Sequence, residues 1–435
     1  MPDTLTLSEI QKLQFSDKHR AEQAALSMIK PYHGSSVKYV ELTPKPESLN
    51  SINGFVTFEN GERYFFKAHT EENEHVSQYY NSSILAEAGY PVISARQVAH
   101  EPGEQIVLYE ILTFPTLFDQ VEEQEDLLRT SGEEGTANGA QTQGTKWQRL
   151  VKAQTELDTK VCKIYQETLT SRSEKEQAAA AIHQLFHHRL QEDGRLGLFY
   201  RGNHLELPQG KFSFEQLSQL GWTINGAQYD QSLAQIIERS QHLLQPGAGP
   251  AIVGHGDAHN GNVFVEDTGQ ELRFYFFDPA FAGVHSPILD MTKPIFHNVF
   301  ARWMYYPEQV VDQFEIAYKI IGDRIIIEHT YQPSDLRLKF LASRKRQLLV
   351  PIIDHLKREG MLPQNWQEQL RAALFCCPFL TVNLLAKPVA NGTLAERYPL
   401  AIKLLGLSMA IEFGASTHKG NNAINAIIDD LFSVN

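Results

Sequence analysis

The order of hydrophobic and polar positions differs between the two ends of the chain. Over residues 1–112, short runs rich in β-branched and aromatic residues occur at 37–43, 55–59 and 62–68, with turn residues between them. Asn-Gly at 60–61 joins the last two runs and favours the two-residue turn of a β-hairpin. This end of the chain is therefore predicted to begin with three strands.

A helix and a second pair of strands are expected next. Three glutamates within 71–74 suit the first turn of a helix, where the helix dipole favours carboxylates, and Gly89 followed by Pro91 ends that helix. Strand-like runs follow near 92–100 and 105–112. The predicted order of elements in this part is thus β-β-β-α-β-β.

Beyond this part the spacing of apolar residues is mostly helical. An acidic helix is predicted near 117–129 and an alanine-rich helix over 174–190, and residues 251–277 turn to strand character. Residues 131–145 contain four glycines and no Val, Ile, Leu, Met or aromatic residue. Because such a stretch buries too little apolar surface to offset the entropy lost on ordering, residues 131–145 are predicted to form a mobile insert.

These patterns predict an α+β fold in two parts. With 435 residues, the chain is too long for one small domain. We expect a small β-rich N-lobe over residues 1–112 and a large, mainly helical C-lobe over residues 113–435. A cleft is expected where the two lobes meet.

Charge and cysteine content narrow the choice of partner and compartment. The formal net charge of −13 argues against an unspecific nucleic-acid binder, whose affinity comes from neutralising phosphates. Residues 151–435 carry 27 Lys and Arg against 30 Asp and Glu, so most of the acidic excess lies in residues 1–150. The three cysteines include no pair at metal or redox spacing, and neither a secretory signal nor a membrane span is apparent. A cytoplasmic protein without nucleic-acid or membrane partners is expected.

One segment carries the candidate chemistry. An apolar strand ends in a loop that holds Asp257, Asn262 opens the next apolar strand, and a turn at 267–270 returns a third strand that ends at Asp278. The hairpin brings Asn262 and Asp278 to the same end. An amide oxygen beside a carboxylate suits Mg²⁺, which completes its shell with water and phosphate oxygens. Asp257 is then free to accept a proton from a nucleophile.

The run His255-Gly-Asp257-Ala-His259-Asn-Gly-Asn262 resembles the signature of the aminoglycoside phosphotransferase and choline kinase superfamily. A later segment that ends in Asp290 is similar to the part of that family in which an acidic residue buttresses the catalytic loop. The resemblance implies a bilobal, protein-kinase-like fold. It also implies transfer of the γ-phosphate of ATP or GTP, with Mg²⁺, to a hydroxyl of a small-molecule acceptor that is aminoglycoside-, choline- or sugar-like.

The family's residue roles carry over onto matching positions. By this resemblance Asp257 is the catalytic base, while Asn262 and Asp278 are the metal ligands. His255 and His259 support the loop, with His259 as an orienting hydrogen-bond partner. Asp290 is the residue expected to buttress the loop.

The N-lobe is expected to supply a cation for the nucleotide. Tyr-Phe-Phe-Lys at 64–67 places Lys67 at the end of an aromatic strand, which matches the family's lysine for the α- and β-phosphates. Glu74 is the expected helix partner of Lys67, and Glu87 is an alternative. Backbone groups from Glu110 to Leu112 are expected to bind the purine.

The phosphate-covering loop is predicted at 44–54. It contains Gly54 as its only glycine, so Ser48, Ser51 and Asn53 are the expected hydrogen-bond donors in place of a glycine-rich backbone. This departs from the glycine-rich loop of protein kinases.

Three other classes of function stay open. A protein kinase needs a peptide groove and an activation segment, but only about a dozen residues separate the second predicted metal ligand from Asp290. A catalytically silent nucleotide-binding scaffold would have lost Asp257 or a metal ligand. A zinc hydrolase would use His255, Asp257 and His259 as ligands. The identity of the acceptor, the choice between ATP and GTP and the oligomeric state are not determined by the sequence.

Overall fold

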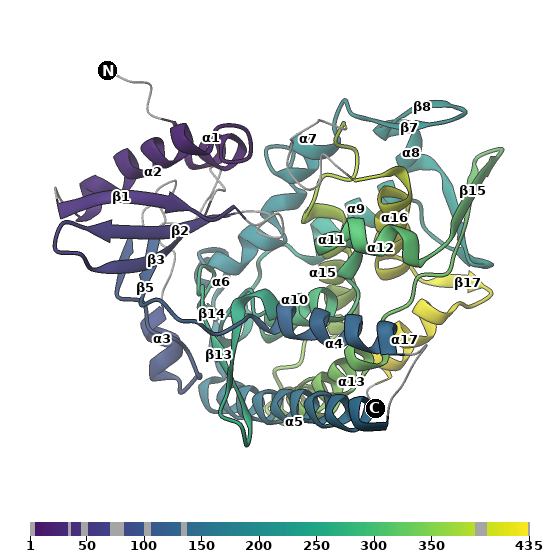
Figure 1. Cartoon of the computed structure of the whole chain (residues 1–435). Coiled ribbons are helices and arrows are strands. Elements are labelled where there is room, and N and C mark those ends of the chain that lie inside the picture. The colour runs from purple at the N-terminus through teal and green to yellow at the C-terminus, as the bar shows by residue number, and fades with distance from the viewer. Residues whose placement is uncertain are drawn as a thin grey trace.

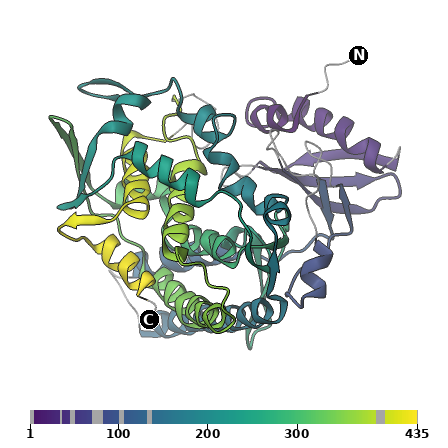
Figure 2. The same ribbon diagram turned by 180° about the vertical axis from the view of Figure 1, so that it is seen from behind.

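The computed structural model describes residues 5–33, 36–44, 51–69, 82–99, 106–131, 137–387 and 398–433. Glu74, Ser48 and most of the helix predicted after residue 70 lie outside these ranges. In Figure 1 the N-terminal sheet and its two helices lie to one side, and most of the other helices lie to the opposite side. Figure 2 shows the same arrangement from behind.

The described residues of the N-terminal part form three helices and five strands, which are α1 Leu7–Leu13, α2 Lys18–His33, β1 Val37–Leu42, β2 Ser51–Phe58, β3 Arg63–His69, α3 Ser82–Glu87, β4 Gln97–Ala99 and β5 Ile106–Tyr109. The strands form one antiparallel sheet in the order β1-β2-β3-β5-β4. The hairpin predicted at 60–61 joins β2 to β3, and Gly61 adopts a φ of +85° there. Helix α2 packs beside β1.

Strand β5 lies between two hydrophobic cores. Because successive side chains of a strand point to opposite faces, its residues alternate between the two. Ile106 and Leu108 pack into a small core with α1, α2 and the inner residues of β1 to β3. Val107 and Tyr109 pack into a larger core that continues through the rest of the chain. The sheet is therefore fixed against the helical part through one face of β5.

The remaining helices are α4 Leu117–Ser131, α5 Ala137–Thr168, α6 Glu174–Ala178, α7 Arg195–Tyr200, α8 Phe214–Gln219, α9 Leu233–Leu243, α10 Pro287–Val299, α11 Arg302–Tyr305, α12 Pro307–Val310, α13 Asp335–Arg344, α14 Val350–Arg358, α15 Trp366–Leu380, α16 Leu400–Gly414 and α17 Ala423–Phe432. Short 3₁₀ or π turns are η2 Ala181–Leu185, η3 His188–Leu190, η4 Asn260–Asn262, η5 Val311–Gln313 and η6 Lys345–Leu349. All of α10 and residues 402–414 of α16 are buried. Helices buried on every side belong in an interior, and α15 packs against both of these helices.

The other strands are β6 Thr170–Arg172, β7 His204–Leu207, β8 Gly210–Ser213, β9 Gly221–Ile224, β10 Ala227–Tyr229, β11 Gly249–Gly254, β12 Val263–Asp267, β13 Leu272–Phe276, β14 Gly283–His285, β15 Ile316–Ile321, β16 Arg324–His329 and β17 Thr417–Lys419. They form the sheets β14-β11-β6 and β15-β16-β9-β10-β17 and the hairpins β12-β13 and β7-β8. β11 and the β12-β13 hairpin carry the motif residues. No described helix is both long and apolar enough to cross a bilayer.

Two segments differ from the sequence prediction. Residues 137–145, predicted as part of a mobile insert, have a helical backbone and begin α5. Extending a helix that already packs elsewhere costs far less than nucleating one, so weak helix formers can continue it. The single helix predicted over 174–190 is wrong, because the chain forms α6, η2 and η3 instead. Five consecutive buried residues, 182–186, do not suit the single buried face of a surface helix.

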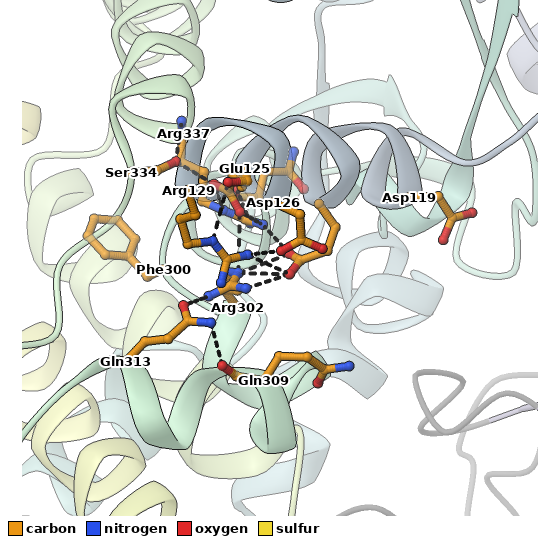
Figure 3. A network of polar contacts seen from close by, with 12 residues as sticks. Asp119, Glu125, Asp126, Arg129, Phe300, Arg302, Gln309, Gln313, Ser334 and Arg337 are labelled. Carbon is orange, nitrogen blue, oxygen red and sulfur yellow. Dashed lines mark hydrogen bonds and ion pairs between the residues drawn. The ribbon is translucent and has the colours of Figure 1, made fainter. Parts of the chain in front are cut away.

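A buried network of charges holds α4 against α11 and α13 (Figure 3). Arg337 of α13 donates to both carboxylate oxygens of Glu125 on α4, at 2.8 and 3.0 Å, and to the carbonyl of Asn298 at 3.0 Å. Arg302 of α11 donates to Glu122 at 2.9 Å and lies 3.3 Å from Glu125. Burial raises the pKa of Glu125, but the two arginines outweigh it and hold the pKa below its usual range.

Arg337→Met is expected to destabilise the protein by about 3–5 kcal/mol, because it leaves the Glu125 carboxylate buried without its main partner. Urea unfolding at pH 7 measures this loss. Arg346→Met is the matched control, because Arg346 lies nearby in η6 and is exposed, and its cost should stay within about 0.5 kcal/mol. Equal losses in the two variants would contradict a stabilising role for the network.

Glu412 of α16 is a buried carboxyl group without a charged partner. Asn422 Nδ2 donates to Glu412 Oε1 at 3.1 Å, and no described residue donates to Oε2. His329 Nε2 lies 3.9 Å from Oε2, but burial lowers the pKa of His329 to about 4, so its ring is neutral at pH 7. Burial raises the pKa of Glu412 to about 8. The folded protein therefore keeps a proton on Glu412 at neutral pH.

Glu412 gives stability a pH dependence of known sign. Its pKa is about 4.3 in an unfolded chain and about 8 in the folded protein, so its contribution to stability falls as pH rises between these values. Glu412→Gln removes this contribution. Urea unfolding at pH 5 and pH 8.5 should show the variant gaining stability relative to the wild type at the higher pH. The same pH dependence in both proteins would contradict the raised pKa.

Candidate active site

The loop between β11 and β12 carries Asp257 and Asn262. The chain leaves the buried strand β11 at His255 and turns at Gly256, whose φ of +79° suits glycine. A Cβ at Gly256 would lie 2.5 Å from the carbonyl oxygen of Phe281. After η4, the side chain of Asn262 turns back and its Nδ2 donates to the carbonyl of Asp257 at 2.9 Å. The loop is thus closed on itself by one of the predicted metal ligands.

Asp278 follows β13 in an uncommon backbone conformation, with a φ of +55°. Its N–H donates to the phenol oxygen of Tyr109 at 2.9 Å, and the N–H of Phe277 donates to the carbonyl of Asn262 at 3.0 Å. Non-glycine residues with positive φ are rare and concentrate at functional sites. Asn262 and Asp278 lie at the same end of the β12-β13 hairpin, where the sequence placed them.

Lys67 reaches this hairpin from the N-terminal sheet. Its Nζ forms an ion pair with Asp278 Oδ2, donates to Asn262 Oδ1 at 3.3 Å and lies 5.5 Å from the ring centre of Phe277. The side chains of Lys67 and Asp278 are only 14% and 10% exposed. Residues 195 positions apart in sequence are therefore in direct contact.

The pair of Asn262 and Asp278 fits a Mg²⁺ ion. Asp278 Oδ1 is buried and no described residue donates a hydrogen bond to it. A carboxylate and an amide oxygen match the preference of a hard divalent cation that fills its other positions with water or phosphate. Among the described residues, no three His, Cys, Asp or Glu side chains are grouped to hold a metal ion. A metal at this hairpin would therefore need ligands from the nucleotide or solvent.

Asp257 lies beside Lys293, a lysine of α10 that no motif predicted. Asp257 Oδ1 is 3.5 Å from Lys293 Nζ, and Oδ2 is 3.7 Å from His259 Nε2. Burial raises the pKa of Asp257, but Lys293 and the neighbouring histidines outweigh it and hold the pKa below its usual range. Burial lowers the pKa of His259 to about 4, so its ring is neutral at pH 7. Asp257 is thus an ionised hydrogen-bond acceptor.

Asp290, near the start of α10, contacts the loop in front of Asp257. Its Oδ1 accepts the Gly256 N–H at 2.6 Å and lies 2.7 Å from His285 Nε2, and its Oδ2 accepts the hydroxyl of Tyr165. Burial raises the pKa of Asp290, but these hydrogen bonds and His285 hold it below its usual range. One buried carboxylate therefore ties α5, α10 and β14 to the loop.

Two residues of α10 and one of β5 complete the surroundings of the site. Asn298 Oδ1 accepts a hydrogen bond from the N–H of Asn260 at 2.7 Å, and the phenol oxygen of Tyr109 accepts one from the N–H of Asp278. Sequence reasoning missed Lys293, Asn298 and Tyr109. A signal for the first two exists, since polar residues recur in α10 although every position of that helix is buried.

Several predicted residues lie elsewhere. The side chain of Glu110 is 72% exposed beside Arg96, and Leu112 is half-buried, so neither side chain joins the Lys67 cluster. The binding of a purine by backbone groups from Glu110 to Leu112 stays a prediction. Ser51 and Asn53, predicted as loop donors, are buried in β2, which already begins at Ser51, and their role as donors stays a prediction. The register nevertheless places Asn53 directly opposite Lys67.

The residues of the zinc alternative do not converge on a common point. His255 Nε2 donates to the carbonyl of Phe277 at 3.0 Å, and its Nδ1 accepts the N–H of Asp257. His259 Nδ1 accepts the N–H of Gly261 at 3.0 Å. Because these ring nitrogens serve the backbone, both histidines brace the loop and the zinc-hydrolase geometry is not present.

Comparison with known proteins gives distant structural likenesses. No protein-family model and no curated protein matches the chain. The structure is similar to an ethanolamine kinase from Plasmodium vivax, with 8% identity, a TM-score of 0.33 and coverage of 96% of this chain and 88% of that one. It is also similar to a glucosamine kinase, with 11% identity, a TM-score of 0.38 and coverage of 86% of this chain and 91% of that one. A third similar structure is a macrolide 2′-phosphotransferase type I, with 12% identity, a TM-score of 0.24 and coverage of 81% of this chain and 94% of that one.

At such identities and TM-scores the likeness does not by itself assign a function. The functional assignment therefore rests on the cluster of Lys67, Asn262 and Asp278 and on the loop that carries Asp257.

Asp290→Asn is expected to weaken the loop, because an amide nitrogen cannot accept the hydroxyl of Tyr165 and the carboxylate's charge is lost. The expected cost is about 1–3 kcal/mol, the range for a buried hydrogen bond broken on one side. Urea unfolding measures it. Tyr165→Phe removes one of the same hydrogen bonds and should cost less. A neutral Asp290→Asn variant would contradict the role of Asp290 in holding the loop.

Proposed function

We propose that this chain transfers the γ-phosphate of ATP, with Mg²⁺, to a hydroxyl group of a small molecule, with GTP as the alternative donor. The proposal is carried by one observation: Lys67, Asn262 and Asp278 meet in a shielded cluster at the loop of Asp257. Phosphoryl transfer needs little covalent chemistry from the protein. It needs positioning and neutralisation of the phosphate charge, which a lysine, two oxygen ligands and a carboxylate can supply.

Lys67 and the two ligands serve the nucleotide end of the site. Asn262 and the unpartnered Asp278 Oδ1 would hold Mg²⁺, which supplies positive charge to the phosphate oxygens when bound. Lys67 already contacts both ligands, so its ammonium is within reach of phosphates bound at the same hairpin. Glu74, outside the described residues, stays our proposed helix partner for Lys67.

Asp257 serves the acceptor end of the site. Its carboxylate stays ionised through neutral pH, because the pKa lies below the usual range. Such a weak base suits a loose transition state, in which orienting the hydroxyl matters more than removing its proton early. Asp257 therefore accepts the hydrogen bond of the acceptor hydroxyl and takes its proton as the new bond forms.

The purine is proposed to bind to backbone groups from Glu110 to Leu112. These residues directly follow β5, whose last residue, Tyr109, contacts the backbone of Asp278. A base held there leaves its phosphates on the side of the Lys67 cluster.

The proposed function is tested with Mg·ATP and a panel of aminoglycosides, choline-like amines, sugars, amino acids and macrolides. Phosphorylated product is followed by mass spectrometry and ATP consumption by a coupled assay. Asp257→Asn, Asp278→Asn and Lys67→Met should each lower turnover by at least about 100-fold, because each removes a positioned catalytic or charge-neutralising group.

Asp267→Asn provides the matched control. Asp267 lies at the far end of the same hairpin, is 50% exposed and pairs with Arg149, so its loss should leave turnover within about twofold. Wild-type turnover that survives in Asp257→Asn would overturn the proposal. Nucleotide binding without turnover would favour the scaffold, and phosphorylation of casein alone would favour a protein kinase.

A further inference from the structure

Lys293 is a buried lysine in contact with the proposed base. The residue is 4% exposed, and its Nζ lies 3.5 Å from Asp257 Oδ1 and 3.4 Å from His297 Nε2. Burying an ammonium group is costly unless it is paired and hydrogen-bonded. Among the described residues, Asp257 is the carboxylate within ion-pair distance of Lys293. Burial lowers the pKa of Lys293, but the adjacent Asp257 carboxylate opposes this shift and favours the ammonium form. The ion pair therefore fixes a cation at the acceptor end of the site.

His297 and Tyr305 fix the direction of Lys293. An ammonium group only donates hydrogen bonds, so His297 Nε2 must be the acceptor of its bond with Lys293. The ring proton then resides on Nδ1, which lies 2.7 Å from the hydroxyl oxygen of Tyr305. Burial lowers the pKa of His297 well below its usual range, which agrees with a neutral ring. Lys293 is thus oriented before any ligand binds.

Asp257 Oδ1 has capacity for one more partner beside Lys293. This oxygen is buried, and no described residue donates a hydrogen bond to it. Lys293 Nζ, 3.5 Å away, forms an ion pair with Oδ1 but no hydrogen bond. A hydroxyl that donates to Oδ1 would therefore stand next to the ammonium group, and its oxygen could accept a hydrogen bond from Lys293.

We propose that Lys293 binds the acceptor oxygen together with Asp257, and that this fixed cation selects hydroxyl compounds that are neutral or acidic near the reacting oxygen over those with an ammonium group there. The inference rests on the proposed function and names the acceptor class for that same site.

The charges around Asp257 support this selection. The charges of Asp257 and Lys293 compensate each other, and burial keeps the ring of His297 neutral. An ammonium group on the acceptor would meet the like charge of Lys293, and repulsion is strong in a site shielded from water. The acidic excess of the chain lies mostly in residues 1–150 and so does not offset this cation.

The test uses two matched sets of acceptors with Mg·ATP. One set is glucose, glucuronate and glucosamine, and the other is glycerol, glycerate and 2-amino-1,3-propanediol. Each set holds a neutral, an acidic and an ammonium compound on a similar skeleton. The wild type should show a higher kcat/KM for the neutral or acidic member than for the ammonium member of a set.

Substitutions separate binding of the acceptor from a merely structural role. Lys293→Met should lower kcat/KM for the neutral or acidic members by about 10- to 100-fold, the effect of one charge-assisted hydrogen bond. The ratio of their kcat/KM to that of the ammonium member should fall as well. Lys293→Arg should keep part of the preference. Lys403→Met removes another buried lysine, one that donates to the carbonyl of Ala386, and should leave the preference unchanged.

The outcomes distinguish the two proposals. A wild-type preference for the ammonium compounds, or a Lys293→Met variant that lowers kcat/KM equally for every member, would overturn the role of Lys293 while leaving the phosphotransferase intact. Failure to phosphorylate any compound here or in the wider panel would overturn the proposed function, and this inference with it. Stabilisation by Mg·ADP in a thermal-shift assay shows that Lys293→Met is folded.

Discussion

The ion pair between Lys67 and Asp278 is the contact on which the arrangement of the site depends. Lys67 belongs to the N-terminal sheet, and Asp278 belongs to the hairpin that carries the motif. Because both side chains are largely shielded from water, leaving either one unpaired would be costly. Tyr109 adds a second contact between the same two regions by accepting the N–H of Asp278. Together these contacts fix the sheet over the loop of Asp257.

Other buried charges hold the loop from behind. Asp290 ties the backbone at Gly256 to α5 and β14. The side chain of Asn298 accepts a hydrogen bond from the N–H of Asn260, and the backbone carbonyl of Asn298 accepts one from Arg337. Arg337 continues to Glu125 on α4 (Figure 3). A carboxylate, Asp290, thus holds one end of the loop, and an arginine, Arg337, stands behind the other end through Asn298. The geometry of such hydrogen bonds is more restrictive than apolar packing.

The sequence predicted those features that depend on local spacing. The hairpin at 60–61 and the strands around Asn262 and Asp278 follow from short patterns that encode turns and pairing. The contact of Asp290 with the loop joins residues 34 positions apart, and only the family resemblance implied it. The helix predicted over 174–190 failed, because its alanines favour a surface helix with one buried face, whereas packing buries all of residues 182–186. Helical propensity is a weak guide when tertiary packing opposes it.

The sequence by itself determined the chemical types in the site: a loop carboxylate, an amide and a carboxylate at one end of a hairpin, and a lysine on an aromatic strand. Only the tertiary structure decided that Lys67 meets Asp278, and that Lys293 stands beside Asp257. The reason is physical. Spacing along the chain specifies neighbours within a turn or a hairpin, whereas contacts between distant elements depend on how whole helices and sheets pack to bury their apolar faces.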